Sequence, residues 1–482
     1  MALTDRDALI AFYNATGGEN WRITTNWNTG ADLSQWHGVK ANGQGRVVGL
    51  YLRLINLTGP MPKELGDLTE LKELALYNNN LTGPIPPELG NLGALKTLDL
   101  GVNELTGPIP KALGNLSKLE TLWLPENRLT GPIPPELGKL GAVQHLDLGG
   151  NKLSGPIPKE LRDLTELQEL RLYNNDVTGP IPKELGNLTQ LKKLHLLNNN
   201  LTGPIPEELG ALTELKELVL RRNSLTGRLP QQLGNLSALE ILNLSWNMLD
   251  GPIPKELGNL TQLKGLHLIN NNLTDPIPPE LGKLDALQRL FLSYNQLTGS
   301  IPPELGKLAA LKSLDLTGNQ LTGGIPKVLG ALRKVEKLNL SGNHLSGPLP
   351  PELGNLAAVQ HLNLAGNRLS GGPRQNEPVS AWRSRLQVKL AEQERAEKSR
   401  AEEHARLERG GTIAAPDGRC SSSGREDEEQ VFRAQVASFA ELDSLTRDSH
   451  GTLEEVKQLI RNPAANSCLR STESTDTDKL RE

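Results

Sequence analysis

The pair His145 and Asp147 is the arrangement in this sequence that comes nearest to catalytic chemistry. Side chains two residues apart share one face of a strand, but an oriented general base is not evident in this pair. A nucleophile for such a base to activate is not evident beside them. The thiol of Cys420 is the other candidate, but His404 and His450 are near it only in sequence, in a stretch without the pattern of a packed core.

The motifs that mark common enzyme classes are absent from the sequence. It contains no phosphate-cradling GxxxxGK[ST], no protein-kinase signature set and no HExxH zinc motif. We therefore expect no enzyme activity, no cofactor and no metal site. The net charge is -4 at pH 7, so the chain also lacks the basic footprint of a nucleic-acid-binding protein, and we expect no nucleic acid partner.

The dominant feature of the sequence is a repeat with a period of 24 residues, of which LKELALYNNNLTGPIPPELGNLGA, from 71 to 94, is a clear unit. An asparagine occupies one column of every unit from Asn79 to Asn367, and one earlier unit places Ile55 in that column. The chain therefore contains fourteen units without an insertion or deletion. One unit cannot bury its own leucines, so the units must stack, and the two ends of the stack need caps.

The chemistry of the unit explains how it folds. Leu74 and Leu76 alternate with Ala75, which predicts a short strand with its leucines on one side. The Asn79 side chain can hydrogen-bond the backbone of the turn that follows. Gly83 permits a bend, and the two prolines after it are expected to keep the return path extended and non-helical.

The form LxxLxLxxNxLTGPIPxELGNL resembles the plant-type leucine-rich repeat, which is common in receptor-like proteins, and the resemblance covers residues 1–372. It implies an α/β repeat solenoid, a right-handed leucine-rich repeat superhelix with a parallel β-sheet on its concave face. It also implies a protein that recognises a ligand, although the chain lacks the membrane span and kinase domain of the receptor-kinase members.

Residues 1–46 are predicted to form the N-terminal cap. Thr4 and Asp7 have the spacing of a capping box, and three tryptophans supply apolar area to cover the first unit. The stretch SQWHGVKANGQGRV resembles the plant-type cap pattern CxWxGVxCxxxxGRV, with Ser34 and Ala41 at its two cysteine positions. The cap is therefore predicted to fold without a disulfide bond.

The location predicted from the sequence is the cytoplasm. The N-terminal residues do not have the pattern of a signal peptide, and the only cysteines are Cys420 and Cys468. The alternative is an extracellular protein exported by a missed or non-standard route.

Composition divides the chain into four regions: the cap, a solenoid at 47–372, a charged helix at 373–409 and a flexible tail at 410–482. The helix carries Trp382, Leu386 and Leu390 on one side, which could close the last repeat, and the alternative is a solvated helix. The tail is expected to contain short amphipathic helices, one of them around Phe432, Val436, Phe439 and Leu442, that could bind a partner or pack within the chain. Its GTLEEVKQLIRNPAANS segment faintly resembles one ankyrin helix, and the end of the tail is expected to be disordered.

Comparison of the units with one another locates the variable positions. The leucine columns barely change, whereas the outward strand columns vary and are expected to line the concave face. The aromatic residues between 47 and 370 all fall in outward columns: Tyr51, Tyr77, Trp123, Tyr173, Trp246, Phe291 and Tyr294. Aromatic and arginine side chains are the usual anchors of protein interfaces.

We therefore predict a partner-binding surface between about 121 and 294. Its predicted residues are Trp123, Asp147, Arg171, Tyr173, His195, Arg221, Arg222, Trp246, His267, Arg289, Phe291 and Tyr294. Arg222 and Trp246 stand in one column of adjacent units, which predicts a cation–π contact. From Asp315 onward the outward residues become small, which predicts a non-binding end. The alternative for the charged positions is that they only form cross-strand pairs on a solvated sheet.

The leading hypothesis is a non-enzymatic scaffold, acting in signalling or immune-type recognition, that binds a protein or peptide on its concave face. The second is a secreted or wall-associated receptor-like protein, or an inhibitor that binds enzymes or glycans. A remote third is ice binding, through a regular column of threonines at Thr82, Thr106, Thr130, Thr178, Thr202 and Thr226.

Overall fold

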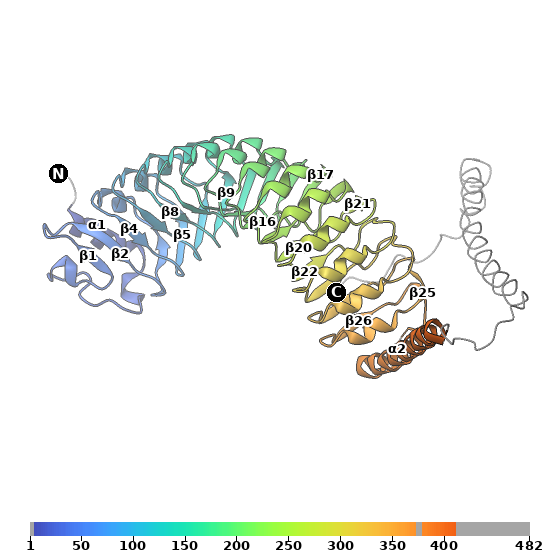
Figure 1. The fold of residues 1–482 in the computed structure, drawn as a ribbon. Coiled ribbons are helices and arrows are strands. Elements are labelled where there is room, and N and C mark those ends of the chain that lie inside the picture. Colours follow the sequence, from blue (N-terminus) through green and yellow to red (C-terminus); the bar gives the residue numbers. More distant parts are fainter. Residues whose placement is uncertain (1–3, 373–377, 411–482) are drawn as a thin grey trace, which may run out of the picture. The chain divides into compact units, whose positions relative to one another are not determined.

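The computed structural model describes residues 4–372 and 378–410, and the predictions made for the tail from 411 onward lie outside these residues. The chain divides into two compact units, residues 1–398 and 399–482. All the repeats belong to the first unit, which is a curved solenoid (Figure 1). The predicted repeat solenoid is confirmed.

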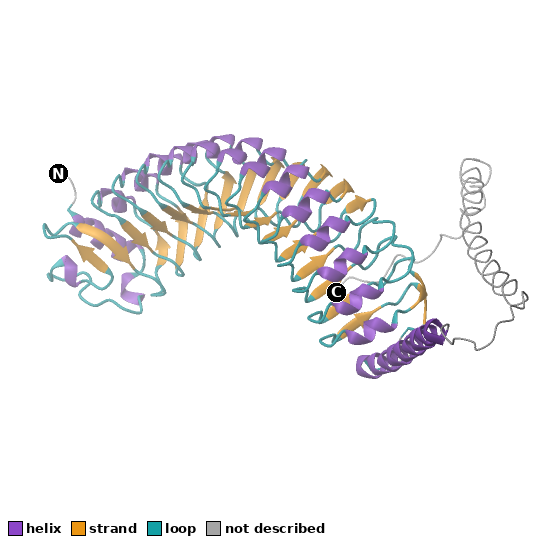
Figure 2. Ribbon diagram, viewed as in Figure 1, coloured by secondary structure: helices purple, strands orange, loops and turns teal. Residues whose placement is uncertain are grey.

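The main sheet lines the concave side of the solenoid, and its strands follow sequence order (Figure 2). The first strand, β1 (Val39–Ala41), pairs antiparallel with β2, and the fourteen strands from β2 onward pair parallel, each leucine facing the equivalent leucine 24 residues away. The fourteen are β2 (Val47–Tyr51), β4 (Glu73–Ala75), β6 (Thr97–Asp99), β8 (Thr121–Trp123), β10 (His145–Asp147), β12 (Glu169–Arg171), β14 (Lys193–His195), β16 (Glu217–Val219), β18 (Ile241–Asn243), β20 (Gly265–His267), β22 (Arg289–Phe291), β23 (Ser313–Asp315), β24 (Lys337–Asn339) and β26 (His361–Asn363).

A second parallel sheet, not predicted from the sequence, is formed by the LTGP segments of the first ten units. Its ten strands are β3 (Thr58–Pro60), β5 (Asn80–Pro84), β7 (Glu104–Gly107), β9 (Arg128–Pro132), β11 (Lys152–Pro156), β13 (Asp176–Pro180), β15 (Asn200–Gly203), β17 (Ser224–Arg228), β19 (Met248–Pro252) and β21 (Asn272–Thr274). A separate pair, β25 (Ser346–Pro348) and β27 (Arg368–Ser370), continues the pattern near the C-terminal end.

Short 3₁₀-helices line the convex side (Figure 2). They are η3 (Lys63–Asp67), η4 (Pro87–Asn91), η5 (Lys111–Asn115), η6 (Pro135–Lys139), η7 (Lys159–Asp163), η8 (Lys183–Asn187), η9 (Glu207–Ala211), η10 (Gln231–Asn235), η11 (Lys255–Asn259), η12 (Pro279–Lys283), η13 (Pro303–Lys307), η14 (Lys327–Ala331) and η15 (Pro351–Asn355). The prediction of a wholly non-helical return path is therefore wrong. The proline directly before each helix is extended and occupies its N-cap position, because proline lacks only an N–H that the first turn does not use.

The repeated Gly of the PELGN segment allows these helices to pack closely. A methyl group on Gly90 would collide with the backbone carbonyl of Ala112 in the next unit. At this position glycine permits the close approach of the two units, although Arg162 occupies the same column in η7.

A ladder of buried asparagines, as predicted, satisfies the turn backbone between the strands. In the unit that contains β12, the Asn175 Nδ2 donates to the carbonyls of Leu148, Leu172 and Tyr173 at 3.0, 3.1 and 3.1 Å. Its Oδ1 accepts from the Leu153 N–H at 2.9 Å. Each asparagine thus joins its own turn to the preceding unit, which fixes the turn where the outward side chains leave the sheet.

The N-terminal cap begins with α1 (Asp5–Ala15), and the predicted capping box at Thr4 is present. Two 3₁₀-turns follow, η1 (Gly18–Asn20) and η2 (Leu33–Gln35). Trp21, Trp27 and Trp36 are all buried, and the Trp27 ring contacts the other two, with centroids 4.8 and 5.0 Å away. The tryptophans cover the first unit as the sequence predicts.

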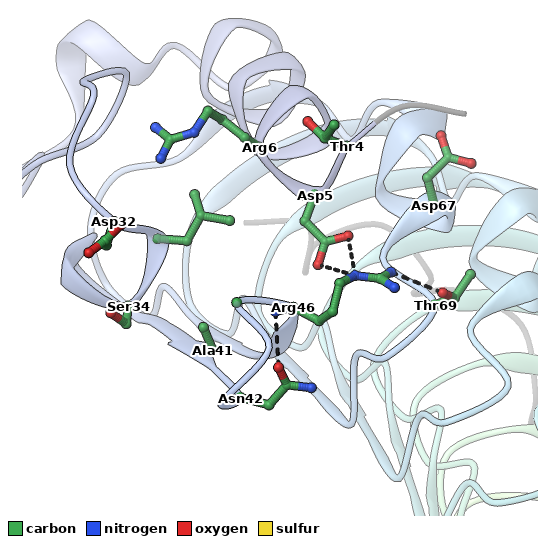
Figure 3. Close-up of a pocket in the computed structure, with 12 residues that line it drawn as sticks. Thr4, Asp5, Arg6, Asp32, Ser34, Ala41, Asn42, Arg46, Asp67 and Thr69 are labelled. Atoms are coloured by element: carbon green, nitrogen blue, oxygen red, sulfur yellow. Dashed lines mark hydrogen bonds and ion pairs between the residues drawn. The ribbon is translucent and has the colours of Figure 1, made fainter. Parts of the chain in front are cut away.

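A buried carboxylate joins the cap to the first strand. Asp5 is 8 % exposed, accepts from Arg46 Nε at 3.0 Å on both oxygens, and accepts from the Val47 N–H at 2.7 Å. Arg46 continues to Thr69 in the first repeat (Figure 3). These groups border a hollow of about 1060 Å³, and Ser34 and Ala41, the cysteine positions of the plant-type cap, line the same hollow.

Asp5→Asn is expected to lower the free energy of unfolding by about 2 kcal/mol, because an amide leaves Arg46 without its counter-charge. Denaturant unfolding followed by tryptophan fluorescence measures the loss, since the three tryptophans lie in the cap. Asp32→Asn is the matched control, because Asp32 is exposed and its side chain makes no hydrogen bond in the described residues. Equal stability of the two variants would contradict a structural role for Asp5.

At the other end, α2 (Val379–Gly410) covers the last repeat with its first turns. Trp382 and Leu386 are 0 % and 1 % exposed, as the predicted stripe requires, while Leu390 is only partly buried. Arg383 Nη1 donates to the carbonyls of Leu356 and Ala357 at 3.2 and 2.8 Å. These contacts close the last unit, whose leucines would otherwise face water.

Candidate ligand-binding surface on the concave sheet

Each repeat presents four outward positions on its concave side. They are the first and third residues of the strand, the residue two positions later, and the turn residue after that; in the unit of β12 they are Glu169, Arg171, Tyr173 and Asn174. The concave surface is defined here as these positions from Gly49 to Gly366. The leucines between them point inward and are buried, so core packing does not restrict which residue types occupy the outward positions.

The turn column holds its residues in the left-handed backbone region. Arg222, Trp246 and Tyr294 have φ values of 56°, 61° and 55°. Bulky side chains are costly there, and most other units place glycine or asparagine in this column. Trp246 and Tyr294 therefore stand at the edge of the sheet rather than on the strands, where they are 45 % and 59 % exposed. A bulky residue that keeps a strained backbone conformation while its side chain stays exposed favours a functional role for that side chain.

The predicted contact between Arg222 and Trp246 is confirmed: the guanidinium carbon lies 5.9 Å from the ring centroid. Met248, two residues beyond Trp246 in β19, is 47 % exposed and extends the apolar edge. Sequence comparison missed Met248, because it belongs to the second sheet rather than to an outward column. Trp123 lies on strand β8 and is 38 % exposed.

An ion-pair network covers the middle of the concave surface. Arg171 contacts Glu169 at 2.8 Å and Asp147 at 3.5 Å, and Glu169 also contacts Lys193 at 3.2 Å. The prediction of exposure fails for Asp147, which is 6 % exposed, because it also accepts from the Gly149 N–H at 3.0 Å. Burial raises the pKa of its carboxyl. Asp147 therefore orients Arg171 from behind instead of facing a ligand.

His195 is also engaged within the surface, where its Nε2 lies 2.8 Å from a Glu217 oxygen. Burial lowers the pKa of His195, against the opposing effect of Glu217. The catalytic alternative raised by His145 gains no support, since His145 faces Glu169 at 3.9 Å and no nucleophile adjoins it in the described residues.

Three arginines of the surface make no ion pair with any described residue: Arg221, Arg222 and Arg289. Beside them His267 stacks on Phe291, with ring centroids 4.9 Å apart, in space left by Gly265. Its Nε2 is buried without a hydrogen-bond partner. Burial, together with the charges of Arg289 and Arg221, lowers the pKa of His267 to about 4.

The protein is expected to lose stability through His267 as the pH falls from about 6.5 to about 4. In this range the unfolded imidazole binds a proton that the folded one does not, so protonation favours unfolding. The loss attributable to this residue at pH 4.5 is roughly 2 kcal/mol. Thermal unfolding of the protein and of His267→Gln is measured across this pH range. The loss attributable to His267 is the difference between the two proteins in how far the free energy of unfolding falls with pH. Parallel pH profiles would contradict the burial of a neutral imidazole.

The last strands carry a hollow that the sequence did not predict. It measures about 500 Å³ on the concave side of β22 to β26, and Phe291, Asp315, Lys337, His361 and Val379 are among the residues that line it. The small outward residues of these units create this recess. The prediction of a non-binding end thus overlooked its shape.

The threonine column lies in the second sheet, where Thr106, Thr130, Thr178 and Thr202 are exposed. Ser154 and Asp250 interrupt the column. In the described part of the chain, no group of acidic, histidine or cysteine side chains could hold a metal ion, and no helix is long and apolar enough to cross a membrane.

Family models agree with the repeat assignment. A model described as a leucine-rich repeat region matches residues 46–179 and 175–300, and leucine-rich repeat models match 309–369 and 285–325. A search of curated proteins finds no match.

Solved structures share the fold. The crystal structure of PEPR1–AtPEP1 is 38 % identical, with a TM-score of 0.74 over 76 % of this chain and 52 % of that one. The plant peptide hormone receptor RGFR1 in complex with RGF2 is 36 % identical, with a TM-score of 0.57 over 69 % and 64 %. A leucine-rich repeat protein of Leptospira interrogans is 38 % identical, with a TM-score of 0.57 over 68 % and 80 %.

The chain spans about half the length of PEPR1 and less than two thirds of RGFR1. The leucine-rich repeat models nevertheless cover more than half of this chain, and their matches follow its repeats. The chain belongs to the leucine-rich repeat family, in its plant-type form.

Proposed function

We propose that the protein is a non-enzymatic scaffold that binds a peptide or protein segment along its concave surface, between about Trp123 and Tyr294. The observation that carries this proposal is the placement of bulky side chains where the fold disfavours them. Trp246 and Tyr294 occupy strained turn positions and remain largely exposed. Neither residue packs the core, so a contact outside the chain is the physical reason to keep them.

The similar structures support ligand binding by this fold. RGFR1 is a plant peptide hormone receptor seen with RGF2. A role in signalling or immune-type recognition is proposed from this likeness and from the resemblance of the repeats to receptor-like proteins. The same likeness favours the extracellular alternative over the cytoplasmic location suggested by the cysteine content. A secreted or wall-associated receptor-like protein is therefore the preferred form of the proposal.

A site-specific cross-linker tests where the ligand binds. The full chain is produced with a photoreactive phenylalanine derivative at position 246 or at 328, which lies on the convex side and is 40 % exposed in the native protein. Both proteins are irradiated with the secreted peptides and proteins of the source cells. We expect a specific adduct at 246 and none at 328. Equal adducts at both positions, or none at 246, would overturn the proposal.

Ice binding stays a remote second candidate, since threonines of the second sheet are exposed at regular spacing. The interruptions at Ser154 and Asp250 weaken it. Thermal hysteresis of the purified protein decides: ice binding requires a measurable gap between melting and freezing, and the peptide-binding proposal predicts none.

A further inference from the structure

The charges on the concave surface are segregated along its length. From Gly49 to Asn174 the outward columns hold five carboxylates and two arginines: Glu73, Asp99, Glu126, Asp147, Glu169, Arg53 and Arg171. Asp99 and Asp147 are buried, so Glu73, Glu126 and Glu169 are the carboxylates within reach of a ligand. From Lys193 to Tyr294 it carries four cations and one carboxylate: Lys193, Arg221, Arg222, Arg289 and Glu217. The first stretch is named the acidic half and the second the basic half. The two halves have opposite net charge although the whole chain is nearly neutral.

Ion pairs within the surface do not neutralise either half. In the acidic half, Arg53 pairs with Asp99 at 3.2 Å and Arg171 serves both Asp147 and Glu169. Glu73 and Glu126 make no ion pair in the described residues. The unpaired charges of the basic half are the three arginines described above. Each half therefore offers charge that a ligand of opposite sign can satisfy at little cost in broken contacts.

Aromatic side chains accompany the charge in both halves. In the acidic half the Tyr173 ring covers Gly149, and the Tyr77 ring lies against Gly101, so both rings use space that glycine leaves. Burial, with a contribution from the charges of Asp147 and Glu126, raises the pKa of Tyr173 to about 12. Exposed Trp123 lies between them. Aromatic faces beside carboxylates favour ammonium or guanidinium groups.

Building on the proposed function, we infer that the ligand is a peptide of segregated charge. Its cationic segment lies over the acidic half, around Tyr77, Trp123 and Tyr173. Its anionic segment lies over the basic half, at Arg221, Arg222 and Arg289. Trp123 and Trp246 are five units apart, so the two charged segments are separated by ~24 Å, or about seven residues of extended peptide.

Designed peptides test the charge order. The probe is an end-capped peptide of about thirteen residues with lysines at one end, glutamates at the other and about seven uncharged, partly aromatic residues between them. One comparison peptide has the same composition with alternating charges, and another replaces the charged residues with glutamine. Binding to the full chain is measured by fluorescence anisotropy. We expect the segregated peptide to bind at least about tenfold more tightly than either comparison peptide.

Protein variants locate the effect. Arg221→Glu together with Arg222→Glu is expected to weaken binding of the segregated peptide at least about tenfold, whereas Arg228→Glu, on the exposed second sheet, leaves it unchanged. A photoreactive group beside the lysines should cross-link to residues 73–174, and one beside the glutamates to 219–294.

Equal affinity for the segregated and alternating peptides would overturn the inference. If Trp246→Ala then weakens both equally, the concave surface still binds peptides and the proposed function stands. The inference is also overturned if no designed peptide binds, or if Trp246→Ala does not change the binding of the peptides. The proposed function is then tested separately, by cross-linking of the natural ligand at position 246.

Discussion

Asn175→Ala is expected to lower the free energy of unfolding by about 4 kcal/mol, because one substitution removes four hydrogen bonds in the buried ladder. The Leu153 N–H loses its acceptor, and the carbonyl of Leu148 loses the donor that reached it from the next unit. Alanine leaves a cavity where the amide was and offers no group that can hydrogen-bond these backbone atoms. The loss should appear first in the units on either side of residue 175, since each unit contacts mainly its neighbours.

Urea unfolding gives the total loss, and hydrogen exchange at the Leu153 amide gives its local part. The control is Asn187→Ala, because Asn187 lies exposed at the end of η8 and its side chain makes no hydrogen bond in the described residues. We expect the control to change stability by less than about 0.5 kcal/mol. A loss below about 1 kcal/mol for Asn175→Ala would show that the ladder does not hold the turns.

Trp246→Ala combined with Arg222→Ala is expected to weaken ligand binding at least about a hundredfold, while the protein stays folded. Both side chains are exposed and in contact with each other, so their removal leaves no buried cavity. Alanine also relieves part of the crowding at two left-handed turn positions. Stability is therefore expected to change little, in contrast to the large loss of affinity.

Isothermal titration of the ligand recovered by cross-linking measures this effect, and the two single variants complete a double-mutant cycle. The cycle should report a coupling of about 0.5–1 kcal/mol, the energy of an exposed cation–π contact. Val328→Ala on the convex side is the matched control for loss of an exposed apolar side chain. Unchanged affinity of the double variant would place the ligand elsewhere on the protein.

The sequence was sufficient for the repeat because every unit repeats the same local chemistry. The leucine columns predicted the inward faces, and the column of asparagines predicted the ladder, since a buried amide at a fixed position needs fixed partners. The contact between Arg222 and Trp246 followed from a 24-residue register without insertions. These features lie within one unit or relate equivalent positions of neighbouring units, so the repeat period and the residue types are enough to predict them.

Other features depend on three-dimensional relations that the period does not contain. The second sheet forms only because the LTGP segments of neighbouring units come within pairing distance. Asp147 is buried because Arg171 and the Gly149 N–H converge on it, although its column is otherwise outward. The hollow beside Phe291 results from small residues in successive units, which sequence reasoning treated as a lack of contacts.

Hydroxyl-radical footprinting of the protein with and without its ligand tests most directly whether the concave surface is the binding site. We expect reduced oxidation of Trp123, Trp246 and Tyr294 in the complex, because these exposed rings become covered by the ligand. Oxidation of convex Val328 should be the same in both samples. Unchanged oxidation of the three aromatic residues, or protection confined to Val328, would contradict the account.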